Sequence, residues 1–233
     1  MAEPSRALVV GASRGLGLGL AAELQHRGWH IVATARDGKG EERLRGVAAE
    51  PGGALTIERV DINDSAAVAG LRRRLDGFVF DLVFVNAGIA GPRHQDAAHA
   101  SPEEAAAVFL TNAVAPIRLA RVFLDRVRDG AGIIALMSSG LGSIADNTHG
   151  YSELYSASKA ALNSLSRSLA ATLGRHRVTV LAVAPGWVRT DMGGPGAPLS
   201  VAESACGIVD VLEARRGTGR HGFVDYSGRE LAW

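Results

Sequence analysis

The sequence predicts an α/β fold in which a parallel sheet is covered by helices on both faces. Short apolar stretches recur along the 233 residues, each with the length of a buried strand. Longer stretches with helical spacing lie between them, and this alternation is typical of βαβ units in a doubly wound sheet. The expected strands are residues 7–10, 29–35, 54–60, 79–85, 132–137 and 178–184, with 223–225 as a short seventh strand.

Helices are expected between these strands. No repeat or low-complexity linker divides the chain, and its length suits one sizeable core, so residues 1–233 are expected to form a single domain. The glycine-dense patches fall between the elements, where turns are needed. The expected helices are residues 15–27, 41–50, 65–75, 102–128, 152–174 and 201–215.

The composition narrows the classes of partner. Hydrophobic residues make up 47% and charged residues 21% of the chain, with a net charge of +1, so neither nucleic acid nor an anionic membrane is expected. Cys206 is the only cysteine, which excludes an internal disulfide and a cysteine-based zinc cluster, and we expect it in the core. Neither a signal peptide nor an apolar run of about 18 residues is evident, which predicts a cytoplasmic protein.

A glycine-rich turn joins the first expected strand to the first expected helix. Its sequence is Gly11-Ala12-Ser13-Arg14-Gly15-Leu16-Gly17. Glycines permit a tight turn and close backbone approach, and the free N–H groups at a helix start attract a pyrophosphate. Strand, turn and helix in this order predict a dinucleotide site in a Rossmann-type sheet.

The segments that follow the other strands carry most of the remaining polar residues of interest. Ligands of an open parallel sheet lie beyond the carboxyl ends of its strands, so these segments are expected to border one crevice. They are residues 36–37, 61–62, 86–88, 138–139 and 185–190.

Tyr155 and Lys159 form the most informative pair. Four residues apart on a helix, they share one face and can address the same bound molecule. A free phenol has a pKa near 10, and a nearby positive charge lowers it. The pair therefore has the layout of a proton donor and the cation that tunes it.

Taken together, these motifs resemble the short-chain dehydrogenase/reductase family over essentially the whole chain. Segments 142–147, 185–194 and 223–228 look more narrowly like its C-factor-like subgroup. The matching motifs, in chain order, are Gly11-x-x-x-Gly15-x-Gly17, Asp61, Asn86-Ala87-Gly88, Asn112, Ser139, Tyr155-x-x-x-Lys159 and Pro185-Gly186.

The resemblance implies a catalytic role for four residues. Tyr155 would protonate a carbonyl oxygen, or act as the base in the reverse direction, and Lys159 would lower its pKa and bind the nicotinamide ribose. Ser139 would hold the carbonyl oxygen. Asn112 would anchor a water that links Lys159 to solvent, and the full set of motifs favours this role over the alternative of a helix residue bonded only to neighbouring backbone.

The serine is the least secure of these assignments. Ser139 precedes Tyr155 by sixteen residues, whereas the spacing in many relatives is about a dozen, so Ser138 and Ser143 are alternatives. We prefer Ser139 because it follows the strand and opens a Ser-x-x-Gly turn, which places the extra length in residues 143–154. Tyr151 is a rival tyrosine, but no lysine lies four residues after it.

Cofactor preference is predicted from charge. Ala35 stands where NAD-binding relatives carry an acidic residue, while Arg36 and Arg14 suit a 2′-phosphate, so NADP(H) is favoured over NAD(H) unless Asp37 points inward. The residues implied in cofactor binding are Gly11, Ser13, Arg14, Gly15, Leu16, Gly17, Arg36, Asp61, Ile62, Asn86, Ala87, Gly88, Tyr155, Lys159, Pro185, Gly186, Val188 and Thr190.

The expected activity is therefore the NADP(H)-dependent interconversion of an alcohol and a small ketone, aldehyde or quinone. The alternatives are a cofactor-binding signalling or interaction protein that does not need turnover, and a lyase or isomerase on the same scaffold. No metal is expected. Substrate loops are predicted around residues 89–96, 140–151 and 187–198, and a homodimer or homotetramer through the helices 102–128 and 152–174.

Overall fold

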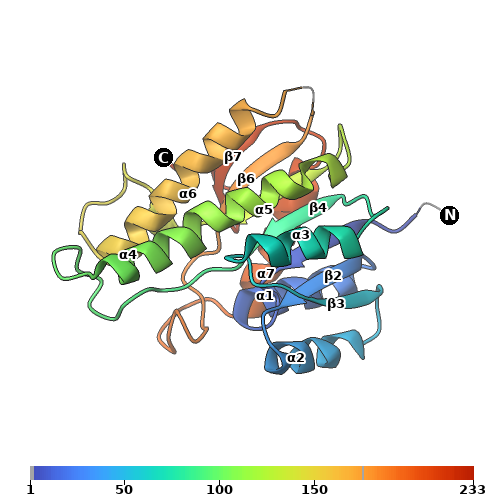
Figure 1. Cartoon of the computed structure of the whole chain (residues 1–233), viewed down its shortest axis with the longest axis horizontal. Helices are drawn as coiled ribbons and strands as arrows, with labels where there is room; N and C mark the ends of the chain where they lie inside the picture. Colours follow the sequence, from blue (N-terminus) through green and yellow to red (C-terminus); the bar gives the residue numbers. More distant parts are fainter. Residues whose placement is uncertain (1–2, 175) are drawn as a thin grey trace.

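The computed structural model describes residues 3–174 and 176–233, and in this part of the chain seven parallel strands form one sheet. The order is β3-β2-β1-β4-β5-β6-β7, so the direction of winding reverses between β1 and β4 (Figure 1). This confirms the predicted fold class. The strands are β1 (Arg6–Val10), β2 (His30–Ala35), β3 (Leu55–Arg59), β4 (Leu82–Val85), β5 (Ile133–Met137), β6 (Thr179–Ala184) and β7 (His221–Asp225).

Helices cover both faces of the sheet. The principal helices are α1 (Gly15–His26), α2 (Gly38–Ala48), α3 (Ser65–Arg74), α4 (Pro102–Phe109), α5 (Ala115–Phe123), α6 (Glu153–Ala171) and α7 (Val201–Arg215). Helices α1, α2 and α7 pack on one face, and α3, α5 and α6 on the other (Figure 1).

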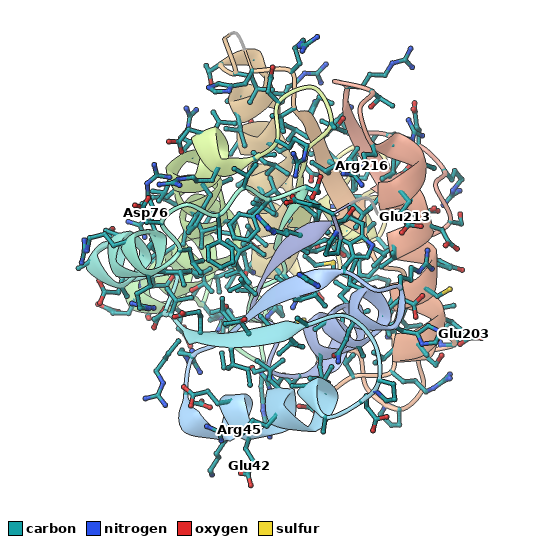
Figure 2. All side chains as sticks on the ribbon, turned by 90° about the vertical axis from the view of Figure 1, so that its right-hand side faces the viewer. Glu42, Arg45, Asp76, Glu203, Glu213 and Arg216 are labelled. Atoms are coloured by element: carbon teal, nitrogen blue, oxygen red, sulfur yellow. The ribbon has the colours of Figure 1, made fainter. Side chains whose placement is uncertain are left out.

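Both faces of the strands are buried, which explains their continuous apolar sequences. In β1, Ala7 and Val9 belong to the core under α1 and α7, whereas Leu8 and Val10 belong to the core under α3 and α5. Charged residues lie on the outer sides of the helices. Figure 2 shows Glu42 and Arg45 of α2 pointing away from the sheet.

The expected helix 102–128 is instead a composite. A π-helical turn, Leu110–Val114, separates α4 from α5, and a short 3-10 turn, Leu124–Arg126, ends the run. Pro116 explains the interruption, because it has no N–H to donate to the carbonyl of Asn112 as an α-helix requires.

Two other expectations need correction. No apolar run long enough to span a membrane was expected. By length and composition alone, however, the stretch Pro102–Arg126 is long and apolar enough to cross one. In the structure, 56% of the apolar window is buried, and Leu119 and Phe123 pack in the core as in a globular domain. Cys206 is exposed on α7 and is not a core residue.

Candidate active site

A single open cleft, about 1820 Å³ in volume, runs along the carboxyl ends of the strands across the point where the strand order reverses. It is larger than a pocket for a drug-sized molecule, and has room for a dinucleotide and a small substrate together. Nearly all of the predicted site residues line it. The two that do not are Gly17 and Asn112, which lie behind its wall.

The glycine turn after β1 is shaped for an anion. Gly11 has a φ of +80°, and a Cβ there would stand 2.8 Å from the Cα of Ala87. A Cβ on Gly17 would stand 2.1 Å from the carbonyl oxygen of Gly11, so this glycine lets α1 pack against the turn. The residue before α1, Arg14, makes no side-chain cap, and the first turn holds no acidic residue. Free N–H groups at this end can therefore bind phosphate oxygens.

The segment after β4 braces the turn. The main-chain N–H groups of Asn86 and Ala87 donate to the carbonyl of Val10, and the side-chain amide of Asn86 donates to that of Gly11 at 2.8 Å. These contacts join the two strands at the reversal point and leave Gly88 on the floor of the cleft.

Positive side chains gather at the end of β2. Arg36 and Asp37 are both exposed and line the cleft, and the Asp37 carboxylate caps α2 by accepting from the N–H of Gly40 at 2.8 Å. Lys39 and Arg43 also line the cleft. Neither was among the predicted cofactor-binding residues, and their spacing of four places them on one face of α2.

Arg14, on the glycine turn, also lines the cleft. Its guanidinium lies 3.2 Å from the carboxylate of Asp191, and both side chains are exposed. After β3, Ile62 is buried, and a carboxylate oxygen of Asp61 accepts from the N–H of Asn63 at 2.9 Å.

Tyr155 and Lys159 lie together on α6, as predicted from their spacing. The ammonium of Lys159 is 5.6 Å from the centre of the Tyr155 ring and donates to the carbonyl of Met137 at 2.8 Å. Burial lowers the pKa of Lys159 to about 8.

Burial also raises the pKa of Tyr155, and a hydrogen bond with the Ser139 hydroxyl opposes that rise. The net direction is opposite to the one expected from Lys159 alone. The phenol is therefore protonated at neutral pH and can act as a proton donor.

Of the three serines considered, only Ser139 lies beside the phenol. Ser138 lines the cleft but is 1% exposed, and its hydroxyl donates to the side-chain oxygen of Asn163 at 2.6 Å. Ser143 is 2% exposed and accepts from the N–H of Asp146. Ser139 lines the cleft, and its hydroxyl is the one that opposes the rise in the pKa of Tyr155.

Asn112 is fully buried in the π-helical turn. Its side-chain oxygen accepts from the N–H of Ile89 at 2.8 Å, and its amide donates to the carbonyl of Ile89 and to the Ser158 hydroxyl at 2.9 and 3.0 Å. These bonds tie the segment after β4 to α6 just behind Lys159.

The loop after β6 forms the opposite wall. The carbonyl of Pro185 accepts from the Ser204 hydroxyl, Gly186 has a φ of +79°, and Val188 is buried. The hydroxyl of Thr190 accepts from the N–H of Gly193 at 3.0 Å. These contacts hold the loop against α7 and give the cleft a fixed wall.

The mouth of the cleft is apolar. Leu141, Tyr151, Trp187 and Met192 line it, with 44%, 67%, 59% and 51% of their surfaces exposed. The indole of Trp187 also donates to the carbonyl of Gly193, so it is partly a structural residue. The chain end contributes residues that the sequence analysis missed, namely Asp225, Tyr226, Arg229 and Leu231.

Within residues 3–174 and 176–233, no group of three His, Cys, Asp or Glu side chains is placed to hold a metal ion. His94 lies 3.5 Å from Glu104, and His99 pairs with Asp96.

Known proteins resemble this chain in sequence and in fold. A family model described as enoyl-(acyl carrier protein) reductase matches residues 11–204. A carbonyl reductase from Pseudomonas aeruginosa in complex with NADP superposes with a TM-score of 0.92 at 43% identity, covering 99% of this chain and 100% of that one. An NADPH-bound carbonyl reductase from chicken fatty liver superposes with a TM-score of 0.84 at 31% identity, covering 100% of this chain and 100% of that one. The C-signal protein of Myxococcus xanthus is 36% identical over 156 residues, which are 66% of this chain and 92% of that protein.

Proposed function

Because this chain belongs to the short-chain dehydrogenase/reductase family, we propose that it is an NADP(H)-dependent oxidoreductase that interconverts a carbonyl compound and an alcohol. The observation that carries this proposal is geometric: Tyr155, Ser139 and Lys159 line the same cleft as the glycine turn, with the Lys159 ammonium 5.6 Å from the centre of the Tyr155 ring. Solved relatives that are carbonyl reductases with bound NADP or NADPH support the same class of reaction.

The residues present fit the cofactor. The glycine turn and the uncapped start of α1 would hold the pyrophosphate, because a Cβ on Gly11 would fill the space against Ala87. Arg14, Arg36, Lys39 and Arg43 would hold the 2′-phosphate. Asp61 and Ile62 would flank the adenine, while Pro185, Gly186, Val188 and Thr190 would shape the nicotinamide pocket. The chemistry that NADPH supplies when bound is hydride for the carbonyl carbon.

Side chains of the protein would donate the proton and then replace it. Ser139 would hold the carbonyl oxygen, and Tyr155 would give its phenolic proton to that oxygen as negative charge develops there. The ammonium of Lys159 would stabilise the phenolate that remains. Asn112 would anchor the water that returns a proton to this group.

The test of this proposal is a screen of ketones, aldehydes and quinones that follows NADPH absorbance, with NADH in parallel. We expect selective oxidation of NADPH, and oxidation of NADH alone would refute the role of the positive cluster. Replacement Tyr155→Phe should lower kcat by about a hundredfold or more, because it removes a general acid, while NADPH still binds. Tyr151→Phe, at an exposed tyrosine of the same cleft, is the matched control and should retain activity.

Similarity to C-signal supports one second candidate, a cofactor-binding protein whose biological effect needs no turnover. Survival of that effect in Tyr155→Phe with NADPH still bound would favour this candidate over the reductase.

We also propose that the protein is cytoplasmic and assembles as a homodimer or homotetramer through the α4–α5 run and α6. Leu110 and Val114 on that run are 36% and 46% exposed. Light scattering that gives the mass of a monomer would refute the assembly.

A further inference from the structure

We propose that Gln95 is a positioning residue for Tyr155. It joins the loop between β4 and α4 to the first turn of α6 and thereby fixes where the phenol sits. The inference rests on the proposed function only in taking Tyr155 as the proton donor.

The start of α6 needs hydrogen-bond acceptors. The first N–H groups of any helix lack partners within the helix. Ser152, the residue before α6, is in the left-handed region with a φ of +52° and makes no side-chain cap. Gln95 supplies the cap from a distant segment: its side-chain oxygen accepts from the N–H of Tyr155 at 3.0 Å, and its main-chain carbonyl accepts from that of Leu154 at 3.2 Å.

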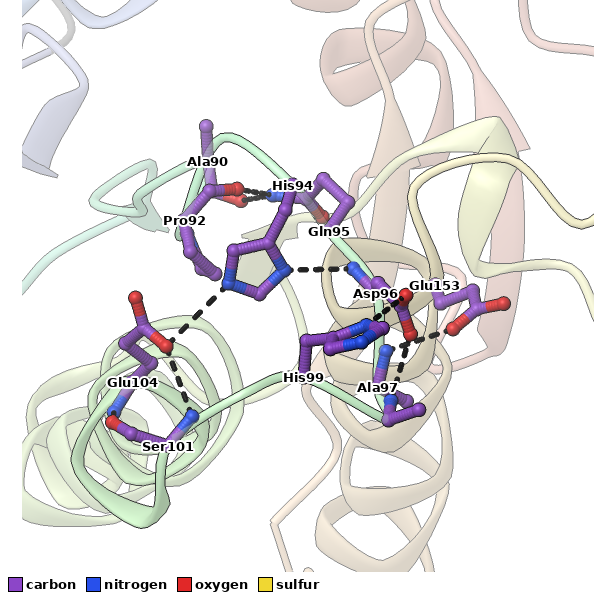
Figure 3. Close-up of polar contacts among 11 residues, drawn as sticks. Ala90, Pro92, His94, Gln95, Asp96, Ala97, His99, Ser101, Glu104 and Glu153 are labelled. Atoms are coloured by element: carbon purple, nitrogen blue, oxygen red, sulfur yellow. Dashed lines mark hydrogen bonds and ion pairs between the residues drawn. The ribbon is translucent and has the colours of Figure 1, made fainter.

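The other end of the Gln95 amide is held by its own loop. The amide nitrogen donates to the carbonyls of Ala90 and Pro92 at 2.7 and 2.6 Å (Figure 3). A reversed amide would set its oxygen against those two carbonyls, so the hydrogen bonds fix which end faces Tyr155.

The loop also donates a hydrogen bond to α6. Glu153, the first residue of α6, accepts from the main-chain N–H of Ala97 at 2.8 Å (Figure 3). Gln95 itself has a φ of +56°, a conformation that residues other than glycine rarely adopt. Such a conformation persists where the surroundings hold it in place, and the contacts on both sides of Gln95 do so.

The consequence concerns the geometry of proton transfer. Tyr155 is held at its main-chain N–H by the loop, and at its phenol by Ser139, which belongs to the turn after β5. Loss of the first contact lets the helix start shift relative to Ser139. Because the loop also borders the cleft, a change in its position reaches the N–H of Tyr155 through this side chain.

The test compares three variants of the full-length protein. Gln95→Gly deletes the side chain but suits the left-handed backbone and keeps the main-chain acceptor. Gln95→Glu keeps an acceptor for the N–H of Tyr155 but loses the donor to Ala90 and Pro92. His99→Ala is the control in the same loop, because His99 is exposed and pairs with Asp96 of its own loop and not with a residue of α6.

Two measurements are made on each variant. Hydrogen exchange of the Tyr155 amide should become faster in Gln95→Gly and stay unchanged in His99→Ala. The kcat for carbonyl reduction should fall about ten- to a hundredfold in Gln95→Gly with the Kd for NADPH unchanged, and clearly less in Gln95→Glu.

Unchanged exchange in Gln95→Gly would overturn the proposal. So would equal losses of kcat in Gln95→Gly and Gln95→Glu, since that pattern would mean that Gln95 only stabilises its loop. If the wild-type protein reduces no carbonyl compound, the proposed function fails, and the exchange measurement still decides whether Gln95 holds the start of α6.

Discussion

Lys159 shows how one residue can serve the site at the expense of stability. Its side chain is buried, and burial lowers its pKa to about 8, which means that the folded protein disfavours the charged form. A positive charge beside Tyr155 is nevertheless what the proposed chemistry needs. A conflict of this kind is typical of functional sites.

We therefore predict that Lys159→Met makes the protein more stable while it abolishes turnover. The pKa falls from 10.5 to about 8 on folding, so the penalty for the buried charge is up to about 3 kcal/mol and is fully present below pH 8. Urea unfolding at pH 7 should therefore give a higher free energy of unfolding for Lys159→Met than for the wild type. Between pH 8 and the ordinary lysine pKa, the unfolded chain binds more protons than the folded one. The free energy of unfolding of the wild type therefore rises with pH over this range, and the advantage of Lys159→Met over the wild type becomes smaller.

A wild type that is more stable than Lys159→Met at pH 7 would contradict this interpretation of the buried ammonium. So would a difference in stability that stays constant as the pH rises past 8.

At the residue scale, the sequence predicted which side chains meet in the cleft, because spacing on a helix and position after a strand determine that much. It did not predict the direction of the Tyr155 pKa, which depends on how deeply neighbouring segments bury the phenol. Lys39 and Arg43 were missed since the helix that carries them begins at Gly38, three residues before the expected start.

At the element scale, the π-helical turn Leu110–Val114 is the feature that most affects the site. Apolar periodicity alone predicted one continuous helix there. Pro116 was the signal for an interruption, but a proline near a helix start is also common, so the local sequence allows both outcomes. The turn places Asn112 between Ile89 and Ser158.

We predict that Asn112→Ala destabilises the protein by about 3 kcal/mol, because it leaves the main-chain N–H and carbonyl of Ile89 without their hydrogen-bond partners. Urea unfolding measures the change. Asn147→Ala is a suitable control, since Asn147 bonds only the N–H of Gly150 on an exposed loop, and it should cost less than 1 kcal/mol, as most surface changes do. Equal and small effects would show that Asn112 is not a structural link.

At the scale of the whole molecule, the position of the cleft follows from topology. The strand order reverses between β1 and β4, so the glycine turn and Asn86-Ala87-Gly88 stand side by side at that point. The sequence predicted this because strand ends in a parallel sheet share one edge. It could not predict the mouth of the cleft, where distant contacts set the shape, as when the N–H of Ala145 donates to the carbonyl of Trp233.

The central claim is that this cleft transfers hydride between NADPH and a carbonyl carbon, and isotope transfer tests it most directly. NADPH that carries deuterium at the transferable position is mixed with the best substrate from the carbonyl screen, and the product is weighed by mass spectrometry. The account predicts one deuterium on the alcohol carbon for each NADPH oxidised, and deuterated product formed about a hundredfold or more slowly with Tyr155→Phe. A product without deuterium, or one formed without net oxidation of NADPH, would contradict it and point to lyase or isomerase chemistry.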